Sequence, residues 1–171
     1  MASMAFKNRR SIVASMLAIS FLLKLSVYFN GLQFSTYENV TIFANLFVLM
    51  TGVFFGIRLF KSNQKEATSF FDDFKAGMRV ASIYALLISV FFYVYYSYID
   101  SSYFDIRIQT QIESMQNLDQ IDKDNAREML DLIYSPYIWS TSSLLGYLFL
   151  GSFYSAIIAF LVRKFSGFRH D

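Results

Sequence analysis

Among the residues that could take part in binding or catalysis, Lys24 stands out, because it is a charged residue inside a long apolar run. A charge within a membrane segment costs about 2.5–3.5 kcal/mol on insertion scales, so such a residue often marks a functional site. We expect polar side chains from the other apolar segments at the same depth, namely Asn45, Tyr93, Ser140 and Ser143. These five residues predict a polar vestibule for an anionic headgroup or a solute. The alternative, which we favour, is that Lys24 extends its amine to the membrane surface and that the other groups bond between helices.

A second informative pattern is the spacing of small residues, which lets helices approach closely. Gly52 and Gly56 are four residues apart, and the same spacing recurs in the last apolar segment, at Gly151, Ser155 and Ala159. We interpret both sets as packing faces inside one helical bundle. The alternative is an interface with another subunit.

Residues that commonly perform catalysis or bind metals are scarce. The chain has no Cys and its only His is His170, and it has neither a glycine-rich phosphate loop nor a His-Glu-x-x-His pattern. Asp72 and Asp73 have the composition of a metal pair, but the helix dipole also favours acids at the start of a helix, and we prefer that interpretation. Gly151 and Ser152 are interpreted as packing residues, since a serine nucleophile needs a base that we do not expect at that depth. We therefore predict no catalytic residue, no cofactor and no metal site, and a protein that is not an enzyme.

The composition indicates an integral membrane protein. Hydrophobic residues make up 55% of the 171 residues and charged residues only 16%, against about 25% charged residues in soluble domains. This hydrophobicity excludes a disordered chain. The net charge of +2, without a long basic stretch, argues against a nucleic-acid partner.

Four apolar segments are long enough to cross a bilayer, which requires roughly 20 residues. They cover about 11–29, 40–60, 77–99 and 137–162. The fold predicted for 1–171 is therefore a single all-α domain of four transmembrane helices. The first apolar run is longer than the roughly 7–15 residues of a signal peptide, and no clear cleavage site follows it, so we expect an uncleaved anchor.

The connection between the second and third segments predicts a helix start. Ser69 and Asp72 have the spacing of a capping box, with Asp in place of the usual Glu or Gln. Phe70, Phe71 and Phe74 follow at helical spacing. We expect an interfacial helix here, lying at the lipid headgroups and running into the third span.

The stretch of about 100–135 is the only sizeable part expected in water. Ile108, Ile112 and Met115 recur on one helical face, and a break is expected at 117–119. A second helix then carries apolar residues on one side: Ala126, Met129, Leu130 and Ile133. The pattern predicts an acidic helical hairpin between the third and fourth spans.

The basic residues predict the orientation, because short cytoplasmic loops are enriched in Lys and Arg. Eleven of the 15 basic residues fall at one end of the predicted spans: Lys7, Arg9, Arg10, Arg58, Lys61, Lys65, Lys75, Arg79, Arg163, Lys164 and Arg169. We therefore expect both termini in the cytoplasm and the acidic hairpin in the periplasm.

The block Gly56-Ile57-Arg58, followed by a polar loop and then Phe71-x-x-Phe74-Lys75-x-Gly77, resembles a family of four-span bacterial membrane proteins. So does the acidic loop that ends in Ser135-Pro136 before the last span. The family is known as domain of unknown function 4199 and is common in Bacteroidota. The resemblance covers nearly the whole chain and implies an inner-membrane location with no established activity. In size and span count, family members also resemble small membrane subunits that accompany polyprenyl-linked glycosyltransferases, which is an analogy.

Taken together, these patterns predict a non-catalytic scaffold or accessory subunit of a membrane complex. Its expected partners are the lipid bilayer and either another protein or further copies of this chain. The protein partner would dock on the acidic hairpin or on the basic loop at 58–79, and that loop would alternatively bind anionic lipid. The alternative function is a small transporter or channel subunit built on the vestibule around Lys24.

Overall fold

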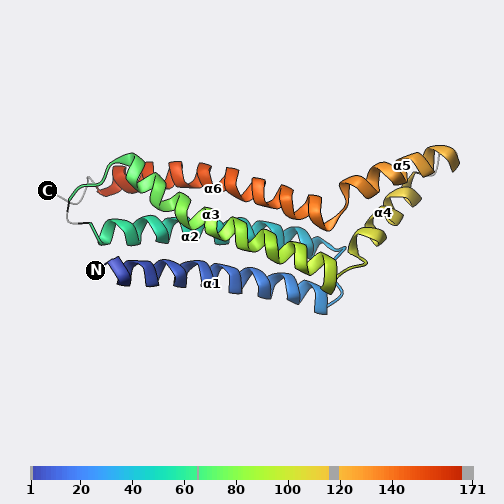
Figure 1. The fold of residues 1–171 in the computed structure, drawn as a ribbon, viewed down its shortest axis with the longest axis horizontal. Helices are drawn as coiled ribbons and strands as arrows, with labels where there is room; N and C mark the ends of the chain where they lie inside the picture. Colours follow the sequence, from blue (N-terminus) through green and yellow to red (C-terminus); the bar gives the residue numbers. More distant parts are fainter. Residues whose placement is uncertain (1, 65, 116–119, 167–171) are drawn as a thin grey trace. The chain divides into compact units, whose positions relative to one another are not determined.

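The computed structural model describes residues 2–64, 66–115 and 120–166, and within these ranges the regular structure is helical, without strands. The helices are α1 (Ala2–Phe29), α2 (Thr36–Ser62), α3 (Phe70–Val94), the π-helix η1 (Tyr95–Ile99), α4 (Tyr103–Ser114), α5 (Gln120–Ile133) and α6 (Pro136–Ser166) (Figure 1). The all-α class predicted from the sequence is confirmed.

Four stretches of this part of the chain are long and apolar enough to cross a membrane: Arg9–Phe29, Thr36–Ser62, Phe70–Ile99 and Pro136–Phe165. They correspond to the four spans expected from hydropathy. The third begins seven residues earlier than predicted, because Phe70–Phe74 is the start of α3 itself and not a separate element. The chain is therefore a membrane protein with four candidate spans.

The chain divides into two compact units. Unit 1 is Met1–Leu87 together with Leu145–Asp171, and unit 2 is Ile88–Leu144. Unit 1 contains α1, α2, the first part of α3 and most of α6. Unit 2 contains η1, α4, α5 and the adjoining ends of α3 and α6.

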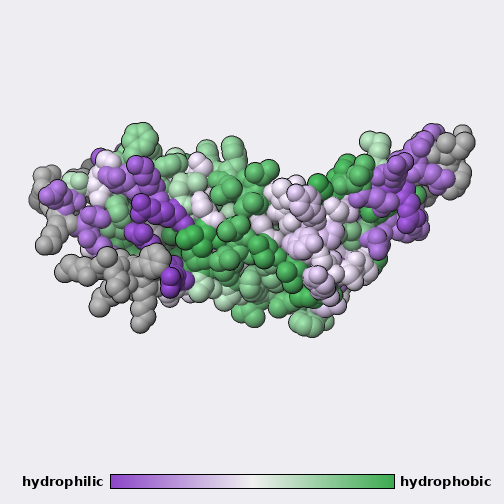
Figure 2. Space-filling model, in the orientation of Figure 1, coloured by the Kyte–Doolittle hydropathy of each residue, from purple (hydrophilic) through white to green (hydrophobic). Residues whose placement is uncertain are grey.

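The core of unit 1 is built from residues three or four positions apart, as expected for helices with one inward face. Leu49, Val53 and Ile57 of α2 are fully buried, as are Tyr84 and Ala85 of α3. The outward faces are apolar too, with exposed residues such as Phe43, Phe47, Leu86 and Phe149. In Figure 2, hydrophobic residues dominate the visible face of the long helices, whereas the α4–α5 segment is mostly hydrophilic. An apolar core inside an apolar surface is what a bilayer-embedded bundle requires.

Small residues set the spacing between the helices of unit 1. A side chain added at Gly56 would collide with Val80 of α3, and one added at Gly151 would collide with Ala81 of α3. At Gly52, the neighbour is the Met16 side chain of α1. All three glycines therefore lie at helix contacts within the unit, which agrees with the internal-packing interpretation of their spacing.

Unit 2 has an aromatic core. The ring of Tyr96 lies 4.9 Å from that of Tyr103, 4.8 Å from that of Phe104 and 6.2 Å from that of Trp139, measured between centroids. The neighbouring Tyr95 is also buried and donates its hydroxyl to Asp100 Oδ2 at 3.0 Å. Tyr95 and Tyr96 continue the helical spacing of the buried residues Ile88 and Phe92, which places both rings in this core.

The stretch between the third and fourth spans contains α4 and α5, which contact each other. Ile108 of α4 and Leu130 of α5 are buried, as their helical spacing predicts. Met129 and Ile133, which we expected on the same face as Leu130, are exposed. The break expected at 117–119 lies outside the described residues.

Candidate functional site

Lys24 of α1 forms a buried ion pair with Glu38 of α2. The Lys24 amine lies 3.3 Å from Glu38 Oε1, and the two side chains are only 6% and 12% exposed. The turn between the helices makes this possible: Gly31 adopts a positive φ of 66°, which favours glycine, and Ser35 caps α2 three residues before Glu38. The Lys24 amine is thus buried against the first turn of α2, and its extension to the membrane surface stays a prediction.

Polar groups continue along the buried faces next to this ion pair. Ser20, one turn before Lys24 on α1, is 2.8 Å from the hydroxyl of Tyr84 on α3, measured between the two oxygens. Thr41 and Asn45 follow Glu38 on the same face of α2, and both are buried. The Oδ1 atom of Asn45 has no hydrogen-bond partner among the described residues. Since a buried acceptor without a partner is costly, this carbonyl is a candidate ligand-binding group.

The other residues of the predicted vestibule belong to unit 2. Tyr93 is exposed, Ser143 is half-buried, and Ser140 is buried with its hydroxyl donating to Tyr137 O of its own helix at 2.9 Å. Lys24 and Asn45 belong to unit 1. The grouping of all five residues at one depth therefore stays a prediction, whereas the Lys24, Glu38 and Asn45 part is a buried polar line within unit 1.

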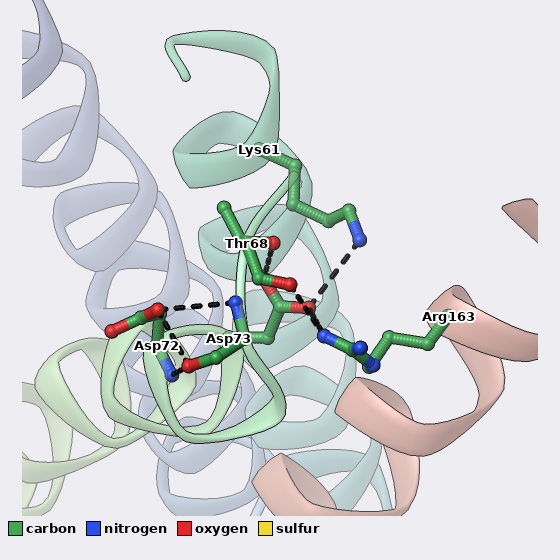
Figure 3. A network of polar contacts seen from close by, with 6 residues as sticks. Lys61, Thr68, Asp72, Asp73 and Arg163 are labelled. Atoms are coloured by element: carbon green, nitrogen blue, oxygen red, sulfur yellow. Dashed lines mark hydrogen bonds and ion pairs between the residues drawn. The ribbon is translucent and has the colours of Figure 1, made fainter. Parts of the chain in front are cut away.

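A second buried charge lies at the start of α3. The Asp73 side chain is fully buried, and its two oxygens bind groups from three places: Thr68 Oγ1 donates to Oδ1 at 2.7 Å, Lys61 Nζ lies 3.3 Å from Oδ2, and Arg163 lies 3.9 Å from Oδ2. Arg163 also donates to the backbone carbonyl of Thr68. Figure 3 shows Lys61, Thr68 and Arg163 converging on Asp73. Asp73 thereby connects α2, the α2–α3 connection, α3 and α6.

The neighbouring Asp72 has a different role. Its Oδ2 accepts the backbone N–H of Ser69 at 3.1 Å and the Ser69 hydroxyl at 2.6 Å, while its own N–H donates to Ser69 Oγ at 3.2 Å. This is the predicted capping box, which is confirmed. The two adjacent carboxylates bind different partners, and no cluster of three or more His, Cys, Asp or Glu residues suited to a metal occurs in the part of the chain that the structure describes.

The motif that carried the family resemblance divides into packing and surface residues. Gly56 and Gly77 are buried, and a side chain at Gly77 would collide with Ser155 of α6. The hydroxyl of Ser155 is buried without a hydrogen-bond partner among the described residues, and Ala159, one turn further, is fully buried. The remaining members lie nearer the surface: Phe74 is half-buried, and Arg58, Phe71 and Lys75 are exposed.

Sequence analysis missed the roles of Glu38 and Asp73. The predicted second span begins at about residue 40, which leaves Glu38 outside it, although Ser35-x-x-Glu38 has the capping-box spacing that starts a helix. Asp73 was interpreted only as an acid at the start of a helix. It nevertheless begins a series of positions with helical spacing, Asp73, Ala76, Val80 and Tyr84, whose members are all buried. That spacing was the available signal.

Comparisons with known proteins give one result. No curated protein and no solved structure matches the chain. The family described as "Protein of unknown function (DUF4199)" matches residues 11–164, and the chain therefore belongs to this family.

Proposed function

We propose that the protein is a non-catalytic accessory subunit or scaffold of a membrane complex, with both termini in the cytoplasm and the α4–α5 segment in the periplasm. The orientation rests on the concentration of basic residues at one end of the four spans, which is expected to be the cytoplasmic end. In this orientation, Phe70 and Phe71 lie at the headgroups of the inner leaflet.

The observation that carries the proposal is an apolar face on α5, outside the four candidate spans. Met129, Leu132 and Ile133 are all more exposed than buried, whereas Leu130 packs inside. Acidic residues of the same helix border this face, namely Asp122 and Glu128. A contiguous apolar face with a charged rim is typical of a protein interaction site. The partner that fits is a membrane protein with an apolar, basic periplasmic surface.

The test is affinity purification of the full chain from native membranes in a mild detergent, followed by mass spectrometry. We expect a stoichiometric partner, and polyprenyl-linked glycosyltransferases are the class to look for first. The substitution Leu132→Ser should reduce the recovery of this partner at least fivefold, since it removes an exposed apolar side chain from the proposed interface.

Arg127→Ser is the matched control, because Arg127 is an exposed residue of the same helix that points away from the apolar face. Recovery of the partner should be unchanged by this substitution. If the wild-type chain is recovered alone, or if both variants lose the partner equally, α5 is not the docking face.

The second candidate function is a transporter or channel subunit, and the buried line of Lys24, Glu38 and Asn45 favours it. Ionisable residues within membrane segments commonly mark ion or proton pathways. The test is proton flux into proteoliposomes that contain a pH-sensitive dye. If the line conducts, replacing Lys24 and Glu38 together with Met and Leu should abolish the flux, and Asn45→Leu should reduce it. Equal flux in the wild type, these variants and protein-free liposomes would exclude this candidate.

A further inference from the structure

A groove of about 380 Å³ runs between α1 and α3. Three arginines line it, Arg9 and Arg10 from α1 and Arg79 from α3. The rest of its lining is apolar, including Val13, Leu17, Ile83 and Leu87. Cationic and apolar side chains thus line the same groove.

The charged and apolar parts of the groove are arranged along the helix axes. The arginines precede the last apolar lining residues, Leu17 and Leu87, by seven or eight positions on their helices. Eight residues of helix extend about 12 Å, which approaches half of a bilayer core of about 30 Å. The groove therefore has cations at one end, and its apolar part is nearly as long as one leaflet of the bilayer core is thick.

A second, shallow groove of about 410 Å³ lies on the surface of α3 alone and adjoins the first. Its lining is Lys75, Met78, Arg79, Ser82 and Ile83, so the two grooves share Arg79 and Ile83. Lys75 adds a fourth cation. Two acids lie at the start of α3: Asp73 pairs with Lys61 and Arg163, and Asp72 accepts hydrogen bonds from Ser69 and interacts electrostatically with Lys75.

A third groove, of about 430 Å³ between α1 and α2, provides a comparison. Its lining includes Ser15, Ile19, Phe47 and Phe55, and none of its lining residues in the described part of the chain is charged. Any lipid tail would fit such a surface. The groove between α1 and α3 differs because its cations select the headgroup as well.

We infer that the paired grooves around Arg79 bind an anionic diacyl phospholipid. The arginines bind the phosphodiester, since the planar guanidinium matches phosphate geometry. One acyl chain occupies the groove between α1 and α3. The other lies along the exposed surface of α3, which includes Ile83 and Leu86.

The experiment measures lipid binding to the detergent-solubilised full chain by native mass spectrometry, with dioleoylphosphatidylglycerol and dioleoylphosphatidylcholine as probes. The wild-type protein should retain phosphatidylglycerol in preference to phosphatidylcholine. The variant Arg9→Gln/Arg79→Gln should bind phosphatidylglycerol about 25-fold more weakly, at about fivefold for each lost charge near the membrane surface.

The matched control is Arg58→Gln/Lys164→Gln, which removes two exposed cations outside the grooves. It should bind phosphatidylglycerol within about twofold of the wild type. A third variant, Ala14→Phe, fills the α1–α3 groove without changing charge, because Ala14 lines it and is exposed. It should weaken lipid binding and leave any binding of glycerophosphoglycerol, the headgroup without chains, unaffected.

Three results would overturn the inference. The first is equal retention of the two lipids by the wild type. The second is equal loss in the groove variant and the control variant, which would indicate a general attraction of anionic lipid to this end of the protein. The third is undiminished phosphatidylglycerol binding by Ala14→Phe, which would indicate a phosphate site without acyl-chain binding. Circular dichroism of each variant checks that it is folded.

Discussion

Unit 1 contains two buried carboxylates, Glu38 of α2 and Asp73 of α3, which lie near opposite ends of α2. Their surroundings differ. Asp73, near the end of α2, has partners on both of its oxygens, supplied by Lys61, Thr68 and Arg163. Glu38, in the first turn of α2, pairs with Lys24. Two turns further along the face of Glu38, the carbonyl of Asn45 is buried without a hydrogen-bond partner in the described part of the chain.

This difference separates a structural charge from a candidate functional one. At Asp73, three chain segments converge and the cations remain partly in contact with water, with Lys61 26% and Arg163 42% exposed. Such a network fixes the ends of helices. At Glu38, both partners are withdrawn from water. A buried ion pair contributes little net stability compared with an apolar pair of similar size, so this pair is a candidate for a role other than stability.

The largest expected effect is that of Glu38→Leu. This substitution leaves the Lys24 amine buried without its carboxylate, which costs about 3–5 kcal/mol of stability. We expect a large decrease in the midpoint of thermal unfolding, measured on the purified protein in detergent.

The double variant Lys24→Met/Glu38→Leu is the control for this prediction. Because it removes both charges and keeps their volume, stability should return to within about 1 kcal/mol of the wild type or exceed it. Loss of function in a stable double variant would identify the pair as functional. If the double variant is as unstable as Glu38→Leu, the pair is structural and the proposed difference between the two carboxylates disappears.

A smaller effect is expected from Asp73→Ala. Thr68 loses its acceptor, but Lys61 and Arg163 can turn toward water, so we expect a loss of about 2–3 kcal/mol. The measurement is again the unfolding midpoint. Lys61→Met and Arg163→Met should each cost less than about 1 kcal/mol, as partly exposed ion pairs do. If Asp73→Ala destabilises the protein as much as Glu38→Leu does, then the contact of Lys61 and Arg163 with water does not reduce the cost of losing Asp73.

The comparison also shows which features the sequence could predict. The four spans follow from the length of apolar runs, and the capping box at Ser69 follows from spacing within four residues. These are local signals. The partners of Glu38 and Asp73 are not local, because Lys24 and Arg163 are 14 and 90 residues away and many pairings satisfy the same pattern.

The aromatic core of unit 2 escaped prediction for a related reason. Tyr95 and Tyr96 follow an apolar span, which is also where interfacial tyrosines occur. The rings that Tyr96 contacts belong to α4 and α6, and no local pattern identifies these partners. The four spans were predictable from hydropathy, whereas the direction of each side chain was not.

The smallest expected effect concerns the helix start that places Asp73. Ser69→Ala removes the hydroxyl that accepts the Asp72 N–H, and loss of such a cap costs about 1 kcal/mol. For a chain of this size, we expect the unfolding midpoint to fall by about 2–4 °C. Ser62→Ala is the matched control, since Ser62 is an exposed serine that bonds only to Leu59 O of its own helix among the contacts described for it. The unfolding midpoint of this variant should not change.

In the double variant Ser69→Ala/Asp73→Ala, the combined loss of stability should be smaller than the sum of the two single losses, because a frayed first turn has already displaced Asp73 from its partners. Strict additivity would mean that Lys61, Thr68 and Arg163 hold Asp73 in place without help from the cap.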